Sequence, residues 1–361
     1  MFFNMLAFEL RYFVRQPSFY IISLMFFFMA FFISSSSKFP LGGANVHMNS
    51  PFSIMMLTIT FCVFAMFLVV NFVASSAIRN SETKMDELVF SKPVNPVPYQ
   101  TGRFFGAYLV VLVVFLTVPL GVLLGSQFGL SVGWLDSELV GPNKFVYYAA
   151  PYFYIAVPSL LVLSAIFNSV AVYFKTMMSV YVAAVVIFIA YQIASAYFDD
   201  LAFRNIVVYA DPFGLGSLID LTRYWTVSDK NTEVLTLTGD LLVNRILWVV
   251  LGLAMFFSLG KLSNRIVAKK QKKQFKVSAF VQNKQAALIN NAKNYKSAGA
   301  STQSQLIMRS IFELKQVIFS APFMILAGVS IVTLMIPLFA PIGAYGTTNW
   351  PITANMVNII S

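Results

Sequence analysis

Apolar residues along the chain are gathered into long unbroken blocks, and this pattern predicts membrane-spanning helices. A block of about 18 or more apolar residues can cross a hydrocarbon core of roughly 30 Å as an α-helix. Continuous blocks favour helices, because a transmembrane barrel requires short segments in which apolar and polar residues alternate. The blocks predict seven spans: Phe19–Ile33, Phe52–Ala74, Phe104–Leu124, Phe145–Phe167, Met177–Tyr197, Leu241–Gly260 and Pro322–Ala340. Pro151 and Pro158 fall inside the fourth block and predict a kink there.

Composition supports an all-α, polytopic membrane protein. Hydrophobic residues make up 58% of the 361 residues, and charged residues only 11%. A soluble domain of this length has about a quarter of its residues charged. We therefore expect the lipid bilayer to be the principal surroundings of this chain.

Lysine and arginine residues favour alternate loops, and this asymmetry predicts the orientation in the membrane. Arg11 and Arg15 precede the first span, and eleven basic residues lie between Lys261 and Arg309 with no acid among them. The loop from about Phe198 to Asp240 is acidic. We expect a multi-pass protein of a bacterial inner (plasma) membrane with a cytoplasmic N-terminus and with the acidic loop outside.

A short internal repeat predicts the domain organisation. The stretch from Phe8 to Phe19 begins Phe-Glu-Leu-Arg and contains a proline, and the stretch from Phe312 to Phe323 begins Phe-Glu-Leu-Lys and contains another. Each leads into an apolar block, so the seventh span restarts the pattern of the first. We expect a six-span module over 1–260, a basic cytoplasmic linker over 261–309, and over 310–361 the entry helix and first span of a second, incomplete module. The linker is either a solvated connection that fixes topology or a segment that binds lipid headgroups or a partner.

Motifs for chemistry are missing from this sequence. A nucleotide-binding P-loop requires G-x-x-x-x-G-K-[ST], but Leu262 follows the Gly260–Lys261 pair and Met255 occupies the position of the first glycine. His47 and Cys62 are the single histidine and the single cysteine. We expect that this chain is not an enzyme, that it has no catalytic, cofactor or metal site, and that it has no nucleic-acid partner.

Charges inside the spans are few. Arg245 lies near the outer end of the sixth span, where we expect its side chain to reach the interface. An ion-coupled transporter usually keeps an acidic residue or a broken helix at mid-membrane. The lack of such an acid in the apolar blocks favours an energy source in another protein.

The loop between the second and third spans has the features of a short amphipathic helix. Asn80 or Ser81 provides an N-cap, acids follow in the first turns, and Pro93 ends the helix. Its apolar face is formed by Met85, Leu88 and Val89. A helix of this kind on the cytoplasmic side either lies on the membrane or docks into a groove of a partner.

This order of elements resembles the ABC-2-type permeases, in which the loop after the second span docks on an ATPase. The residues that match the family's loop are Arg79, Glu82, Glu87, Leu88 and Pro93. The chain departs from it just before the second glutamate, where Thr83-Lys84-Met85 replaces the usual Gly-Thr. The resemblance implies a six-helix ABC-2-type bundle and an ATPase-coupling helix that contains Arg79, Glu82, Met85, Glu87, Leu88 and Pro93.

Further motifs resemble one subgroup, the large ABC permeases fused to an M1-family aminopeptidase. These motifs are Asn45–Phe52, Asp211–Gly214, Thr222–Thr226, Asn231–Thr232 and Asn244–Trp248. The peptidase with its zinc motif does not occur in these residues, so no peptidase activity is assigned.

The resemblance implies a permease subunit that moves a substrate, by export, through alternating access. A separate ABC ATPase binds the ATP, and the second permease half is either another module or a homodimer partner. The alternative is a membrane anchor or scaffold that positions an extracytoplasmic or fused enzyme and transports nothing, with Tyr224 and Trp225 of the acidic loop on its docking surface.

Overall fold

A computed structural model describes residues 1–36, 43, 45–83, 85, 89, 95–195 and 204–258. All of them belong to the first of two compact units of the chain, Met1–Lys284. The seventh predicted span, the basic linker and the second module lie outside the described residues.

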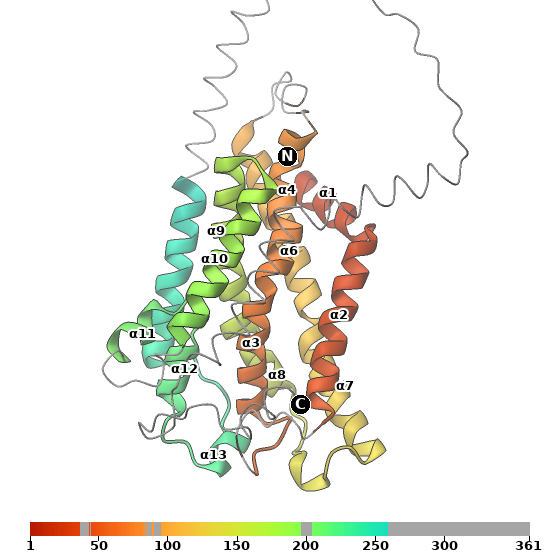
Figure 1. The fold of residues 1–361 in the computed structure, drawn as a ribbon, viewed down its shortest axis with the longest axis vertical. Helices are drawn as coiled ribbons and strands as arrows, with labels where there is room; N and C mark the ends of the chain where they lie inside the picture. The colour runs from red at the N-terminus through yellow and green to blue at the C-terminus, as the bar shows by residue number, and fades with distance from the viewer. Residues whose placement is uncertain are drawn as a thin grey trace, which may run out of the picture. The chain divides into compact units, whose positions relative to one another are not determined.

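The described chain is built from helices alone (Figure 1). In order they are α1 (Phe2–Val14), α2 (Pro17–Ser34), α3 (Pro51–Val69), η1 (Val70–Ala74), α4 (Ser75–Glu82), α6 (Pro96–Phe115), α7 (Thr117–Val132), η2 (Ser137–Leu139), α8 (Phe145–Pro151), η3 (Tyr152–Ala156), α9 (Val157–Phe174), α10 (Met177–Ser195), α11 (Arg204–Ala210), α12 (Leu215–Thr222), α13 (Val227–Thr232) and a last helix, Gly239–Ser258. Six helical segments of this region are long and apolar enough to cross a membrane, which confirms the first six predicted spans.

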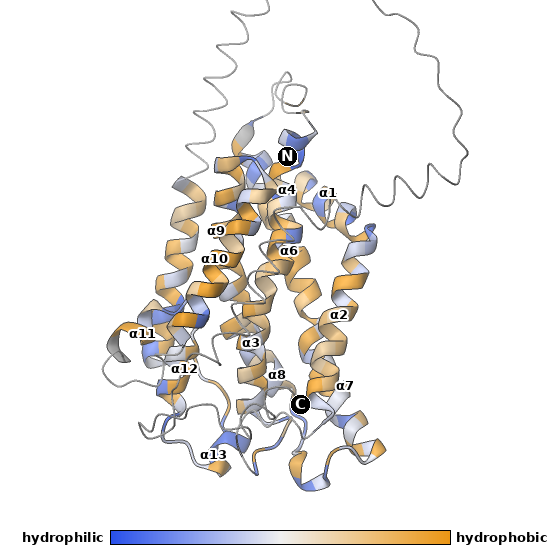
Figure 2. Cartoon of the chain, in the orientation of Figure 1, coloured by the Kyte–Doolittle hydropathy of each residue, from blue (hydrophilic) through white to orange (hydrophobic). Residues whose placement is uncertain are grey.

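Two of these segments are longer than the sequence predicts. The second runs over Pro51–Glu82 and the third over Val97–Val132, with 32 and 36 residues. At 1.5 Å per residue they measure about 48 and about 54 Å, which exceeds the roughly 30 Å hydrocarbon core. Hydropathy detects only the part of a helix that lies in lipid. The polar ends are visible in Figure 2, where the residues around α4 and the start of α6 are more hydrophilic than the middle of the bundle.

The fourth span changes its helical form where its prolines predict a kink. Pro151 ends α8, the π-helical turn η3 follows, and Pro158 lies in the first turn of α9. Proline lacks the N–H that continues the helical ladder, so a local change of hydrogen bonding is expected there. Two tyrosines tie this region to α6: Tyr152 donates to the carbonyl of Leu112 at 2.9 Å and Tyr108 donates to that of Val157 at 2.8 Å.

The second span forms the centre of the bundle. In its most apolar stretch 78% of the residues are buried, against 17% for α2 at the periphery. Phe61, Cys62 and Met66 are wholly enclosed by neighbouring helices. Among the large apolar residues of α2, in contrast, Ile21 and Leu24 are exposed, as expected for side chains that face lipid.

Glycines allow two pairs of helices to approach closely. Gly121, Gly125 and Gly129 recur every fourth residue on α7, and all three face α2. Gly102 and Gly106 have the same spacing on α6 and face α1. Helices in lipid associate through close packing rather than through a hydrophobic drive, so small residues at these contacts determine which helices pair.

We expect Gly121→Val to destabilise the bundle by about 1–3 kcal/mol, because a Cβ there would lie 2.6 Å from the carbonyl oxygen of Phe27 and 2.9 Å from Cβ of Ala30. The measurement is the unfolding midpoint of the purified chain in detergent. Leu120→Ala, at an exposed neighbouring position, is the control and is expected to change it little. Equal midpoints for the glycine variant and the wild type would contradict the packing role.

Candidate functional site

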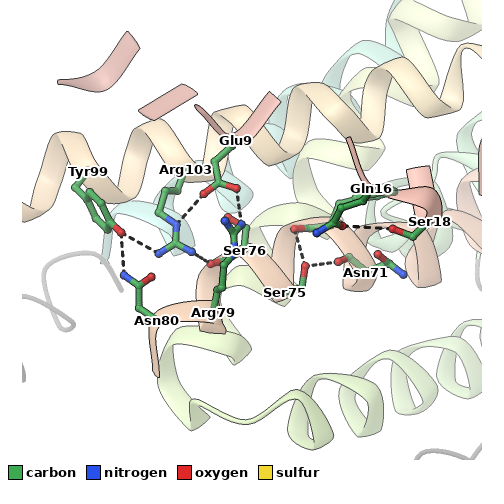
Figure 3. A network of polar contacts seen from close by, with 11 residues as sticks. Glu9, Gln16, Ser18, Asn71, Ser75, Ser76, Arg79, Asn80, Tyr99 and Arg103 are labelled. Atoms are coloured by element: carbon green, nitrogen blue, oxygen red, sulfur yellow. Dashed lines mark hydrogen bonds and ion pairs between the residues drawn. The ribbon is translucent and has the colours of Figure 1, made fainter. Parts of the chain in front are cut away.

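A buried carboxylate between two arginines is the main charged feature of the described chain. Glu9 on α1 is fully buried. Arg79 Nη2 lies 2.5 Å from Glu9 Oε2, and Arg103 Nε lies 3.2 Å from Glu9 Oε1 (Figure 3). One acid therefore holds three elements that are far apart in the sequence: α1, α4 and α6.

The local sequence explains why these three side chains meet. Glu9 lies on the inner face of α1, where a Cβ at Gly106 would come within 2.8 Å of the glutamate Cβ, so the glycine lets α6 approach. Arg79 and Arg103 lie on the polar extensions of the second and third spans. The Arg79 guanidinium also stacks over Tyr12, with its Cζ atom 3.9 Å from the ring centre. Such cation–π contacts strengthen as the pair is removed from water.

Neutral groups complete the cluster. Arg103 donates through Nη2 to the backbone carbonyl of Ser76 and through Nη1 to the Tyr99 hydroxyl at 3.3 Å. The Asn80 amide donates to the same hydroxyl at 2.8 Å. A buried charge is tolerated only when it is paired and hydrogen-bonded, and the cluster of Glu9, Arg79 and Arg103 meets this condition.

The residues of the predicted coupling helix are only partly within the described chain. Arg79 joins the buried cluster, whereas Glu82 ends α4 in an exposed position. Met85 is also exposed, and its N–H donates to the carbonyl of Asn80 at 2.9 Å. The remaining three, Glu87, Leu88 and Pro93, lie outside the described residues.

The predicted start of that helix is wrong. Asn80 and Ser81 were expected to cap a new helix, but both lie within α4, which continues the second span through η1. The amide of Asn80 is directed to Tyr99 rather than to a helix N-terminus. Tertiary contacts of Arg79 and Asn80 keep this stretch helical, and they outweigh the local capping preference of asparagine and serine.

Glu9 is the functional candidate that the sequence analysis missed. A signal for it exists: Glu9 and Phe13 are one helical turn apart, so the acid lies on the same face as a large aromatic residue. An acid on the apolar face of a helix predicts a buried partner of opposite charge. In the sequence alone, the motif Phe8–Arg11 stands out only as half of a repeat.

A second polar cluster lies at the opposite end of the bundle, where the motifs Asp211–Gly214 and Asn244–Trp248 meet. The Asn244 amide donates to the carbonyls of Val208 and Asp211 at 2.7 and 3.0 Å. The Asp211 carboxylate accepts the N–H groups of Phe213 and Gly216 at 2.8 and 3.0 Å. Burial raises the pKa of Asp211, and these two N–H donors and the nearby Arg245 charge oppose that shift. The cluster fastens the turn between α11 and α12 to the last helix.

The expectation that Arg245 reaches the membrane interface is wrong. The residue is only 4% exposed. Its Nη1 donates to Ser159 Oγ at 2.9 Å, and its Nε and Nη2 donate to Oδ1 of Asn244 at 3.1 and 2.6 Å. The guanidinium also packs against Gly214, at a place that any side chain there would occupy. Neutral acceptors inside the bundle hold this cation, because their hydrogen bonds replace those that the guanidinium would make with water at the interface.

Two of the other three motifs, Asn45–Phe52 and Asn231–Thr232, also meet. Asn231 accepts the His47 N–H at 2.8 Å and donates to the carbonyl of Asn45 at 3.2 Å. Asn49 exchanges two hydrogen bonds with the backbone of Gly141, at 2.6 and 2.7 Å. These contacts tie the segment before α3 to the loop before α8 and to α13, so the motif residues have a structural role here.

When it is compared with protein-family models, with curated proteins and with solved structures, the chain matches none of them. The candidate site therefore rests on the geometry above.

We expect Glu9→Ala to reduce the free energy of unfolding by about 3–5 kcal/mol, because it leaves two partly or fully buried arginines without their anion. Chemical denaturation of the purified chain in detergent measures this change. Glu82→Ala removes an exposed carboxylate three residues from Arg79 and is the matched control, with an expected change within about 0.5 kcal/mol. Equal losses in the two variants would show that the Glu9 pair adds nothing to stability.

Proposed function

We propose that this chain is the membrane-embedded permease part of an ABC-2-type transporter, which exports a substrate by alternating access while a separate ABC ATPase binds and hydrolyses ATP. The observation that carries the proposal is the buried cluster of Glu9, Arg79 and Arg103. It fixes the beginning of the charged loop between the second and third spans to α1 and to α6. A loop that is to transmit force requires such a rigid connection to the bundle.

The cluster suggests how a push on residues 81–90 would move the spans. α4 carries Arg79 at the base of this loop, and α1, which carries Glu9, leads directly into α2. Arg103 links the same carboxylate to the third span. A displacement of the loop would therefore move the first and third spans together with the second. The π-helical turns η1 and η3 are candidate hinges, because π-bulges often lie at functional positions.

Two buried charges of the described chain agree with an external energy source: Arg245 in the last span and Asp211 in the turn between α11 and α12. Arg245 is hydrogen-bonded only to neutral groups, and both carboxylate oxygens of Asp211 accept backbone N–H groups. A carboxylate that is engaged in this way holds a turn in place and is poorly suited to carry a proton or ion across the membrane.

The scaffold alternative finds less support. Tyr224 is 87% exposed, but Trp225 is partly buried against the hydrophobic core, so only part of its ring is available to a docking partner. Recovery of an ATP-hydrolysing protein with the tagged chain, extracted from its native membrane, distinguishes the two functions. A transporter requires such a protein, whereas a scaffold does not.

We expect Glu87→Lys and Leu88→Asp to abolish or strongly reduce co-purification of the ATPase and the ATPase activity of the complex, since each change disrupts the proposed docking helix. Glu138→Lys, which alters an exposed acid near η2, is the control with the same charge change. Full ATPase recovery and activity in both loop variants would refute the coupling role of this segment.

We also expect Thr83 and Ser228 to lie on opposite sides of the membrane, with Thr83 cytoplasmic. Both positions are exposed, and Cys62 is buried, so single cysteines can be placed at each in a Cys62→Ser background. An impermeant thiol reagent added to intact cells should label Ser228→Cys and spare Thr83→Cys. The reverse labelling would overturn the orientation that the positive-inside rule predicts.

A further inference from the structure

We propose that α1 carries a binding site for the headgroups of anionic phospholipids, formed by Arg11 and Arg15. The residues of this helix divide into three faces with different surroundings. It does not depend on the proposed transport function.

The inner face of α1 packs on the protein. Glu9 and Phe13 are buried, and the backbone of Phe2 lies against Gly102 of α6. This face fixes the rotation of the helix about its axis. The direction in which each of the other residues points follows from the helical period.

A second face is apolar and uncovered in the described chain. Phe3, Ala7 and Val14 recur at helical spacing and are exposed, Phe3 by 78%, while Leu10 on the same stripe is partly covered by the core. Gln16 is the N-cap of α2 and Pro17 its first residue, so α1 ends where the first span begins. An apolar face at the entrance to a span is suited to the boundary between headgroups and acyl chains.

The third face carries the charge. Asn4, Phe8, Arg11 and Arg15 recur at the same spacing and are all exposed. Neither guanidinium group has an ion pair or hydrogen bond with the described residues, and the carboxylate of α1, Glu9, is buried on the inner face. Arg79 and Arg103, in contrast, are already engaged by Glu9. Two uncompensated guanidinium groups beside a membrane-facing apolar surface are chemically matched to phosphate groups, which arginine binds through paired N–H donors.

The test requires a local readout, because the basic linker also attracts anionic lipid. The fluorophore bimane is attached to the cysteine of Asn4→Cys in the Cys62→Ser chain. The labelled protein is purified in detergent and titrated with brominated phosphatidylglycerol or brominated phosphatidylcholine, which quench the fluorescence. We expect half of the fluorescence to be quenched at a lower concentration of phosphatidylglycerol than of phosphatidylcholine. Arg11→Gln or Arg15→Gln should each raise that concentration about fivefold, and the double variant about thirtyfold.

Three comparisons make the result decisive. Arg11→Lys with Arg15→Lys keeps the charge and should retain most of the preference, and Lys144→Gln, at an exposed position near the start of α8, should change nothing. An unchanged unfolding midpoint shows that the variants fold, as expected for side chains without described partners. The proposal is overturned if both lipids quench equally, or if the double glutamine variant keeps the preference. Displacement of phosphatidylglycerol by millimolar inorganic phosphate would also overturn it, since the site would then bind a free anion and not a lipid.

Discussion

The burial of Glu9 is the constraint on which this end of the bundle depends. A carboxylate without solvent requires cationic partners, and only α4 and α6 supply them, through Arg79 and Arg103. The position of α1 is thereby fixed relative to the second and third spans. Because only Arg15 and Gln16 separate α1 from α2, the same pairing also sets where the first span starts.

Close helix contacts have a complementary role along the length of the bundle. The glycines of α6 bring α1 near enough for Glu9 to reach Arg103, and those of α7 bring α2 against the third span. Lipid gives no hydrophobic drive for these pairings, so they depend on shape and on a few polar contacts. At the opposite end Asn244 and Asn231 perform the corresponding task, because Asn244 bonds to the backbone at the end of α11 and Asn231 to the backbone of the segment before α3.

The two ends of the bundle differ in whether their arginine side chains are engaged within the protein or exposed. At the α11–α12 end the two buried charges are used within the fold: Asp211 holds a turn, and Arg245 is enclosed among neutral acceptors. At the α1 end the inner arginines are neutralised, while Arg11 and Arg15 face outwards. Both proposals, the docking of an ATPase and the binding of lipid headgroups, therefore concern the α1 end, where α4 and the start of α6 extend the second and third spans.

The sequence by itself determined the number and order of the first six spans, because lipid requires a continuous apolar block for each helix and such a block can be recognised locally. It also located Arg79 and Glu82 in the segment at the base of the charged loop. The sequence did not identify Glu9 as a buried ion-pair partner. It predicted a helix cap at Asn80 or Ser81, and it predicted that the Arg245 side chain reaches the membrane interface. All three outcomes depend on partners that are distant in the sequence. Glu9 pairs with arginines 70 and 94 residues away, Asn80 bonds to a tyrosine 19 residues away, and Arg245 bonds to a serine 86 residues away. Only the tertiary structure decides such pairings, since the energy of a buried polar group is set by what surrounds it in space rather than by its neighbours in sequence.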